Sequence, residues 1–343
     1  MRYPEFLREG GTIGFIAPSF GSVMQPYASL FESAVKYFES IGYKTVEGPN
    51  CHADCGIGKS NTASECGSEI NSFFCNDTSD VIISCGGGET MCEDLPFVDF
   101  EKIASSKPKW FMGYSDNTNL VLTLATLCDT ASIYGPCASS FGQKQWHKSI
   151  EDAFDVLCGK KLSVSNYAKW EIEENPNAGV FDSYNCTEDF NIKIFRGSEQ
   201  TDSAQVTGRL LGGCLDCLDT LCGTEFDRVK QFNKKYEKDG TLWFIESCDL
   251  GPMDVRRSLW HLKNAGWFES AKGFLIGRPL RYNDIAFGLD QTKAAIDMLC
   301  DFNVPVIMNL DIGHLPPQMP VICGSVANAR ASAKSFEMDY VLR

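Results

Sequence analysis

The sequence has few histidines, no cluster of basic residues and no long apolar run. Only four His occur in 343 residues, and 31 Lys and Arg stand against 45 Asp and Glu, a formal net charge of -14. Proteins that bind nucleic acid or anionic membranes normally carry a basic patch, so we expect neither partner. No apolar run approaches the roughly 20 residues that a membrane helix needs.

The beginning of the chain, residues 1–5 (MRYPE), also lacks the basic-then-apolar pattern of a secretion signal. We therefore expect a cytoplasmic protein, in which the 16 cysteines would be free thiols. Cys214 and Cys217, like Cys51 and Cys55, do not form a recognised zinc pattern. We expect no metal and no cofactor, and a redox or metal-sensing role for Cys214 and Cys217 is kept as an alternative.

Residues 1–165 alternate between short apolar runs and segments of helical spacing. Such alternation predicts an α/β fold with a parallel sheet covered by helices on both faces. Ligands of such sheets bind beyond the carboxyl ends of the strands. We expect a strand that leads into Ser115, strands at residues 12–17, 43–46, 80–84 and 131–134, and helices at residues 27–41, 64–74, 118–128 and 149–158.

The pattern weakens in the polar residues 166–205, which we interpret as a linker or mobile flap. Residues 206–343 then predict a smaller, β-rich α/β domain. Its expected strands lie at residues 241–245, 273–277 and 304–310, its helices at 214–222, 253–265 and 289–302, and its tail at 321–343 is β-like.

Residues 113–117 (GYSDN) end an apolar run and precede a helical segment. A sharp turn between a strand and a helix is the setting in which a serine nucleophile is presented, here Ser115. Gly113 removes a Cβ from that turn, and a helix N-terminus favours negative charge. The match is partial, because Asn117 stands where the motif usually has glycine. The alternative is that Ser115 or Asp116 only caps the helix.

A serine nucleophile needs a base within hydrogen-bond reach and a group that orients the base. His314 lies in a Gly- and Pro-rich loop after a strand, whereas His261 lies within an ordinary amphipathic helix and His52 and His147 lie in polar loops. Glu246 ends an apolar strand, where a carboxylate needs a partner. That partner is an imidazole; alternatively, Glu246 caps a helix or forms a salt bridge with a nearby arginine at position 256 or 257.

Acyl transfer also needs N–H donors for the developing oxyanion. The N–H of Asp116 follows the serine directly, and a second donor is expected from Gly87 or Gly88, where backbone can approach a ligand closely. The alternative is a phosphate-binding glycine loop, but neither G-x-G-x-x-G nor G-x-x-x-x-G-K-[ST] is present.

The GYSD motif resembles the nucleophile motif of the LD-carboxypeptidase family of serine peptidases. Further similarities follow in the expected order between residues 12 and 324: APS at 17–19, GG at 87–88, LP at 95–96, YGP at 134–136, GRLLGG at 208–213, FIE at 244–246 and GH at 313–314.

The resemblance implies Ser115 as nucleophile, His314 as general base, Glu246 as its orienter, and Asp116 with Gly87 or Gly88 as oxyanion donors. It also implies a flavodoxin-like N-terminal half, a smaller C-terminal β-rich half, a site between them and a homodimer, with no metal or cofactor.

Two substrate types occur in that family. Murein-recycling members remove the terminal D-alanine of muropeptide tetrapeptides, and microcin-immunity members cut an amide between a peptide and a nucleotide-like group, using a flap aromatic to stack on the base. Gly86 and Glu89 depart from the murein pattern, and residues 93–96 (EDLP) look closer to the microcin-immunity branch. Trp170 is expected either to stack on the base or to anchor the flap. A catalytically silent ligand-binding protein is the alternative to a peptidase acting on a small peptide or peptidyl-nucleotide.

Overall fold

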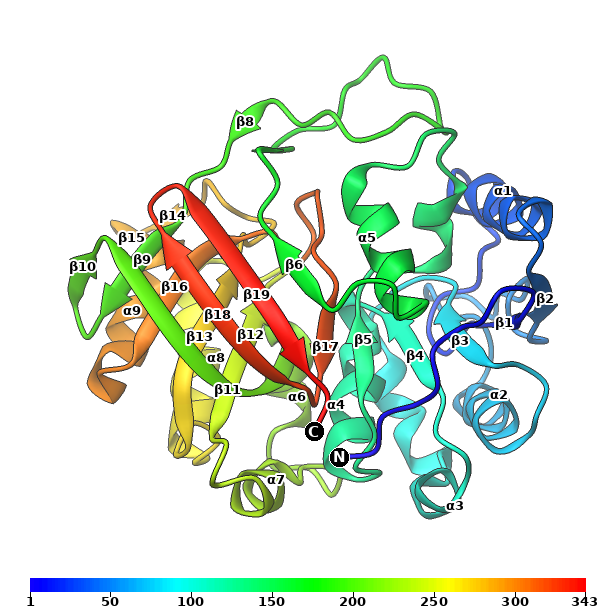
Figure 1. The fold of residues 1–343 in the computed structure, drawn as a ribbon, viewed down its shortest axis with the longest axis horizontal. Coiled ribbons are helices and arrows are strands. Elements are labelled where there is room, and N and C mark those ends of the chain that lie inside the picture. Colours follow the sequence, from blue (N-terminus) through cyan, green and yellow to red (C-terminus); the bar gives the residue numbers. More distant parts are fainter.

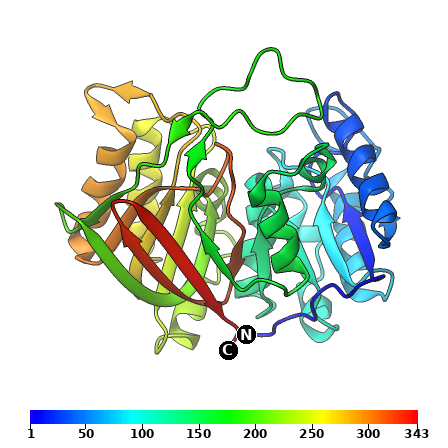
Figure 2. The same ribbon diagram turned by 45° about the horizontal axis from the view of Figure 1, so that its top comes forward.

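The structure, a computed structural model, describes residues 1–343 and contains two large sheets side by side (Figures 1 and 2). The N-terminal sheet has six strands in the order β17-β5-β4-β3-β1-β2. All neighbours pair in parallel except β17, which runs antiparallel to β5. The strands are β1 (Thr12–Ile16), β2 (Lys44–Glu47), β3 (Val81–Ser84), β4 (Trp110–Gly113), β5 (Ser132–Tyr134) and β17 (Val321–Cys323).

Helices pack on this sheet through apolar faces spaced by three or four residues. On the first helix Phe31, Ala34 and Phe38 are buried, and the ring of Phe31 meets that of Phe15 of β1 at 5.3 Å. The second helix begins after Thr62, whose side chain accepts a hydrogen bond from the backbone N–H of Glu65. The helices are α1 (Tyr27–Ser40), α2 (Ala63–Cys75), α3 (Phe100–Ser105), α4 (Thr118–Thr126) and α5 (Lys148–Leu157).

The second sheet has nine strands in the order β10-β9-β16-β13-β12-β11-β18-β19-β6. Its strands are β6 (Ser163–Ser165), β9 (Lys193–Arg196), β10 (Glu199–Thr201), β11 (Ser203–Cys214), β12 (Thr241–Glu246), β13 (Ala271–Gly277), β16 (Pro305–Leu310), β18 (Val326–Ser332) and β19 (Ser335–Val341). The helices of this part are α6 (Leu215–Leu221), α7 (Val229–Lys235), α8 (Pro252–Asn264) and α9 (Gln291–Leu299). A small hairpin, β14 (Ile285–Ala286) and β15 (Leu289–Asp290), precedes α9.

The expected linker at residues 166–205 is only partly a loop. Its later residues form β9 and β10 and join the second sheet. Its earlier residues contain a two-stranded ribbon, β7 (Lys169–Trp170) and β8 (Glu188–Asp189), and between these strands the chain has neither helix nor strand. This connection arches across the top of both halves in Figures 1 and 2. We refer to residues 171–187 as the flap.

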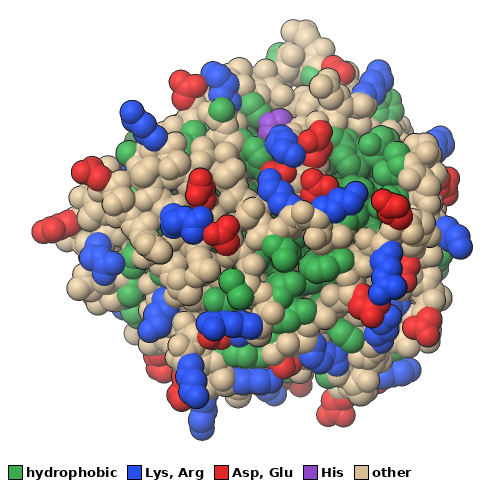
Figure 3. Space-filling view, in the orientation of Figure 1, with side chains coloured by type: hydrophobic (Ala, Val, Ile, Leu, Met, Phe, Trp, Pro, Cys, Tyr) green, Lys and Arg blue, Asp and Glu red, His purple; other side chains and the backbone are tan.

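The α/β class, with a parallel N-terminal sheet and a second β-rich sheet, is confirmed. The two halves are not independent, because β17 comes from residues 321–323 and completes the N-terminal sheet. One hydrophobic cluster of 84 buried residues also extends through both halves. None of the helices is both long and apolar enough to span a bilayer. On the face seen in Figure 3, acidic and basic side chains are interspersed.

Candidate active site

The turn that carries Ser115 joins β4 to α4. Ser115 has φ 63°, a left-handed conformation that residues with a side chain rarely adopt. A Cβ at Gly113 would lie 2.8 Å from Cγ of Asn117, so the turn has no room for a side chain there. The Asn117 amide donates to the carbonyls of Tyr114 and Gly86, at 2.9 Å each. Asn117 therefore holds the turn at the position where the motif usually has glycine.

Ser115, His314 and Glu246 form one chain of hydrogen bonds. Nε2 of His314 lies 2.9 Å from Oγ of Ser115, and Nδ1 lies 2.8 Å from Oε2 of Glu246. The carboxylate is buried, and the histidine side chain is only 12% exposed. Because a carboxylate can only accept, Nδ1 carries a proton and the neutral ring leaves Nε2 free to accept from the serine. This is the arrangement of a nucleophile, a base and an orienting acid.

The other histidines are paired elsewhere. His261 lies 2.6 Å from Asp219, and His52 lies 2.5 Å from Glu47. His147 caps α5 by accepting the N–H of Ser149 at 3.1 Å.

The alternative arginine partners of Glu246 are also engaged. Arg256 binds Asp297 at 2.8 Å, and Arg257 binds Asp254 within α8. Glu246 therefore meets an imidazole and not a guanidinium.

Tyr134, at the carboxyl end of β5, adds a link that the sequence reasoning missed. Its hydroxyl donates to Oε1 of Glu246 and accepts the backbone N–H of Ser115 at 3.1 Å. The phenol thus connects the nucleophile turn to the catalytic acid candidate. A signal was available, since a buried tyrosine needs a partner for its hydroxyl and Tyr134 ends a strand that the sequence predicts.

The loop that carries His314 is held by buried polar contacts. Asp311 pairs with the fully buried Arg278 and accepts the N–H of Tyr167 at 2.8 Å. Gly313 has φ 109°, and a Cβ there would lie 2.5 Å from Oε2 of Glu246. Only glycine lets the backbone pass this close to the carboxylate, so residue 313 sets the position of His314.

Burial and the neighbouring carboxylate act in opposite directions on His314. Burial alone lowers the pKa of the imidazole, but the Glu246 carboxylate, with Cys248 beside the ring, outweighs it and holds the pKa of His314 well above its usual value. Burial likewise raises the pKa of Glu246, and the contacts with His314 and Tyr134 more than offset it, so that pKa is lowered. The pair therefore favours an ionised acid and a strongly basic imidazole.

The predicted oxyanion residues lie against the serine. A Cβ on Gly87 would lie 3.0 Å from Cβ of Ser115, 3.1 Å from its Oγ and 3.9 Å from the backbone nitrogen of Asp116. Gly88 has φ 148°, and a Cβ there would lie 2.0 Å from Oγ of Ser19. The Asp116 carboxylate accepts from the Ser19 hydroxyl at 2.5 Å. These contacts bring the glycine loop and the nucleophile turn together.

Several further acidic groups surround the triad. Burial raises the pKa of Glu89, and the carboxylates of Asp249, Asp116 and Asp216 raise it further. Sequence reasoning named Glu89 only as a departure from the murein pattern and did not anticipate this cluster, because its members lie far apart in the sequence.

Trp170 is 2% exposed and ends β7, directly before the flap. Its ring centroid is 5.1 Å from that of Tyr282 and 4.8 Å from the Arg278 guanidinium, and its Nε1–H donates to the carbonyl of Asp189 at 3.1 Å. These contacts fix the Trp170 ring at the start of the flap, and the anchor role is a prediction. The stacking role stays a prediction.

All 16 cysteines are free thiols. Cys217, on α6, donates to the carbonyl of Ser115 at 3.7 Å, and Cys214 lies beside it. The contact with Cys217, together with burial, holds the pKa of Cys214 well above its usual value. For Cys217 the contact with Cys214 lowers the pKa, but burial and the nearby carboxylates outweigh it and raise the pKa to about 11, so the reactive thiolate is disfavoured at both positions. The redox role of the pair stays an untested alternative.

Comparison with known proteins identifies the family of the chain. Models of the LD-carboxypeptidase N-terminal and C-terminal domains match residues 13–135 and 207–328. The chain belongs to the LD-carboxypeptidase family. A putative carboxypeptidase of Vibrio cholerae is 26% identical, over 99% of this chain and 98% of its own length. The microcin C7 self-immunity protein of Escherichia coli is 25% identical over 93% and 90%, and a probable murein peptide carboxypeptidase of Bacillus subtilis is 22% identical over 98% and 94%.

Solved structures share the fold along the whole chain. An MccF-like protein from Bacillus anthracis has a TM-score of 0.81 at 21% identity, covering 99% of this chain and all of that one. The microcin C7 self-immunity protein in complex with aspartyl sulfamoyl adenosine has a TM-score of 0.80 at 23% identity, covering 99% and 98%.

Proposed function

We propose that this protein is a serine peptidase or amidase that works through an acyl-enzyme. The observation that carries the proposal is the hydrogen-bonded chain from Oγ of Ser115 through His314 to Glu246, at 2.9 and 2.8 Å. The family, whose members include carboxypeptidases, supports the same reaction class. An intact chain of this kind favours catalysis over a silent ligand-binding role.

In the proposed reaction, Ser115 attacks the scissile carbonyl while Nε2 of His314 takes its proton. Glu246 holds the ring by its Nδ1–H and stabilises the imidazolium that forms. The backbone N–H groups of Asp116 and of Gly87 or Gly88 donate to the oxyanion. His314 then protonates the leaving amine, and water, activated by the same imidazole, releases the acyl group.

The proposed substrate is a small peptide-like amide. One relative is a probable murein peptide carboxypeptidase and another is a self-immunity protein solved with an aminoacyl nucleotide analogue. We propose the peptidyl-nucleotide class first, because residues 93–96 resemble the microcin-immunity branch. Trp170 enters the proposal as the anchor of the flap. We also propose that the protein is a cytoplasmic homodimer, as the family resemblance implies.

The deciding experiment incubates the protein with a muropeptide tetrapeptide and with a peptidyl-nucleotide analogue, and identifies the products by mass spectrometry. The Ser115→Ala variant is the matched control. We expect it to lose at least about a thousandfold in turnover while its melting temperature stays unchanged. Equal turnover by the variant, or no hydrolysis of either substrate class by the unaltered protein, would contradict the proposal.

A further inference from the structure

The flap begins on the loop that carries His314. The backbone N–H of Tyr167 donates to the Asp311 carboxylate at 2.8 Å, on the N-terminal side of that histidine. The N–H of Glu171, the first residue of the flap, donates to the carbonyl of Pro316 at 2.7 Å, on the C-terminal side. The segment from Tyr167 to Glu171, here called the flap root, therefore holds this loop on both sides of the histidine.

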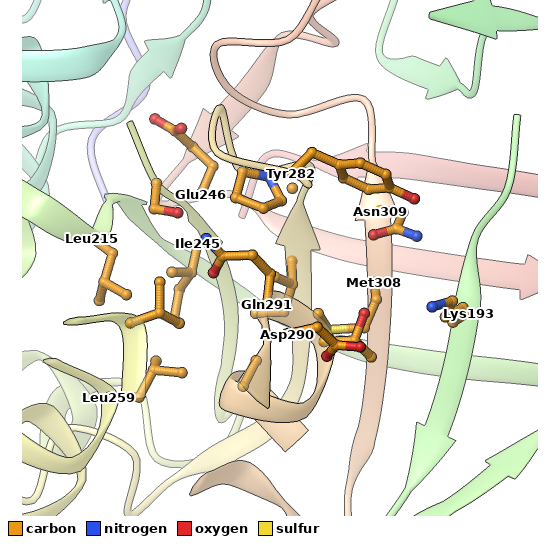
Figure 4. A pocket seen from close by; sticks show the side chains of 17 residues that line it. Lys193, Leu215, Ile245, Glu246, Leu259, Tyr282, Asp290, Gln291, Met308 and Asn309 are labelled. Atoms are coloured by element: carbon orange, nitrogen blue, oxygen red, sulfur yellow. The ribbon is translucent and has the colours of Figure 1, made fainter. Parts of the chain in front are cut away.

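The ring of Trp170 fixes the flap root to the same region. Its centroid lies 4.8 Å from Cζ of Arg278 and 5.1 Å from the centroid of the Tyr282 ring. Arg278 pairs with Asp311 and also donates to the carbonyl of Asn309 at 2.8 Å. In Figure 4 the Tyr282 side chain lies beside Asn309 of β16, the strand that leads into the loop of the base. A shift of the flap root would therefore disturb the contacts that place the base.

Glu171 also joins the two limbs of the flap. It is 6% exposed, and its carboxylate accepts the backbone N–H of Asn185 on the returning limb. The side-chain amide of Asn185 donates to the carbonyl of Glu173 at 3.2 Å. Between the limbs the flap contacts the N-terminal half, where the N–H of Lys144 donates to the carbonyl of Phe181 at 2.9 Å. Glu171 is thus the residue at which both limbs of the flap meet the loop of the base.

We propose that Glu171 is a positioning residue that couples closure of the flap to the placement of His314. With the flap closed, its carboxylate holds the returning limb and its N–H holds the loop of the base, so His314 stays within reach of Ser115. Movement of the flap loosens both contacts, and the base is aligned again only when the flap returns. The catalytic chain is therefore complete only when the flap is closed, as in enzymes whose lids assemble the site. This role rests on the proposed function, because His314 is the base of that reaction.

Three variants test the role of the carboxylate. Glu171→Ala removes the acceptor of the Asn185 N–H, Glu171→Gln keeps an acceptor oxygen, and Glu174→Ala removes a carboxylate from an exposed flap position as the matched control. The rate at which a fluorophosphonate labels Ser115, followed by intact mass, reports activation of the serine without the natural substrate. We expect labelling to be roughly tenfold slower in Glu171→Ala, within about threefold of normal in Glu171→Gln, and normal in Glu174→Ala. Normal labelling of Glu171→Ala, or an equal loss in all three variants, would overturn the assignment.

Hydrogen exchange tests the coupling independently of catalysis. The N–H of Met319 donates to the carbonyl of Asp311 at 2.6 Å, so it reports on the loop of the base. In the unaltered protein the N–H groups of Tyr167, Glu171 and Met319 should share one opening free energy, and in Glu171→Ala all three should exchange about tenfold faster. Unchanged exchange in strand β4 shows that the variant is folded.

Exchange of the flap root about tenfold faster than that of Met319 in the unaltered protein would show that the two move separately and would refute the coupling. This comparison needs no variant, so it decides the question even if Glu171→Ala does not fold. Absence of Ser115 labelling in the unaltered protein would count against the proposed function, whereas the exchange result would still test the coupling.

Discussion

Replacing Glu246 by glutamine tests the proposed catalytic chain most directly. In the structure both carboxylate oxygens accept: Oε2 from Nδ1–H of His314 at 2.8 Å and Oε1 from the Tyr134 hydroxyl. A glutamine amide offers only one acceptor oxygen. One of the two donors must therefore lose its acceptor in the Glu246→Gln variant.

If the Tyr134 hydroxyl keeps its hydrogen bond to the amide oxygen, the NH₂ group faces Nδ1 of His314. Nδ1 must then accept, so the imidazole takes the tautomer that is protonated on Nε2. Nε2 then carries the proton and cannot accept one from Ser115. The same change from acid to amide in a Ser-His-Asp triad lowers kcat by about 10⁴-fold, and we expect a loss of that order here. Turnover measurements with whichever of the two proposed substrates is hydrolysed give the value.

The pH profile provides a second readout. The base must be neutral to act, so kcat/KM should fall as the pH drops below the raised pKa of His314. Without the Glu246 carboxylate the largest contribution that raises the pKa of the imidazole is lost, so that pKa falls. The acid limb of the residual activity should move to lower pH. Turnover within tenfold of the unaltered protein, with the acid limb in place, would refute the reasoning.

A double variant isolates the cause. In Glu246→Gln with Tyr134→Phe the amide oxygen has no competing donor and can face Nδ1–H of His314, which restores the productive tautomer. We expect the double variant to turn over faster than Glu246→Gln alone. Tyr134→Phe alone is the control for the lost phenol. A double variant slower than Glu246→Gln would show that acceptor competition is not the cause.

Three further predictions concern Gly87, Trp170 and Glu69. Gly87→Ala should lower kcat roughly a hundredfold, because its Cβ would crowd Ser115 at 3.0 Å, whereas Gly86→Ala meets only an ordinary 3.4 Å contact and should be near normal. Trp170→Ala should cost roughly 3–5 kcal/mol in the free energy of unfolding, measured by denaturant titration; a changed KM in Trp170→Phe without a change in stability would instead favour stacking on substrate. Burial raises the pKa of Glu69 to about 6, above its unfolded value of 4.5, so the folded state holds the proton more tightly. The free energy of unfolding should therefore fall by about 2 kcal/mol as the pH rises from below 4.5 to above 6. Glu69→Gln should remove that slope and cost about 1–3 kcal/mol, because a backbone N–H that the carboxylate accepts would face an NH₂ group.

Periodicity predicted the elements whose apolar faces are complete within one segment. The expected helix at residues 27–41 is α1, and the apolar run at 80–84 contains β3, buried at every position. β9 and β10 were missed because they lie in a polar stretch and depend on pairing with β16 and with each other. Short helices such as α3 give too few turns for a period to be recognised.

The site likewise contains residues that the sequence identifies and residues that it does not. Ser115, His314 and Glu246 carry motif or positional signals in the sequence, and the structure brings them into hydrogen-bond contact. The role of Tyr134 and the buried pair of Arg278 with Asp311 depend on which chain segments meet in space. Sequence spacing holds no information about such long-range contacts when only one sequence is considered.

The placement of the proposed triad bears on how substrate enters. Ser115 comes from the N-terminal sheet and Glu246 from the second sheet. His314 lies on the loop from β16 to β17, which crosses back to the N-terminal sheet. Separating the halves would break the pairing of β17 with β5 and expose part of a continuous core. Local opening of a segment with few buried contacts costs far less than this. The flap is mostly exposed and contains no regular secondary structure, so we infer that substrate enters by movement of the flap and not by opening of the seam.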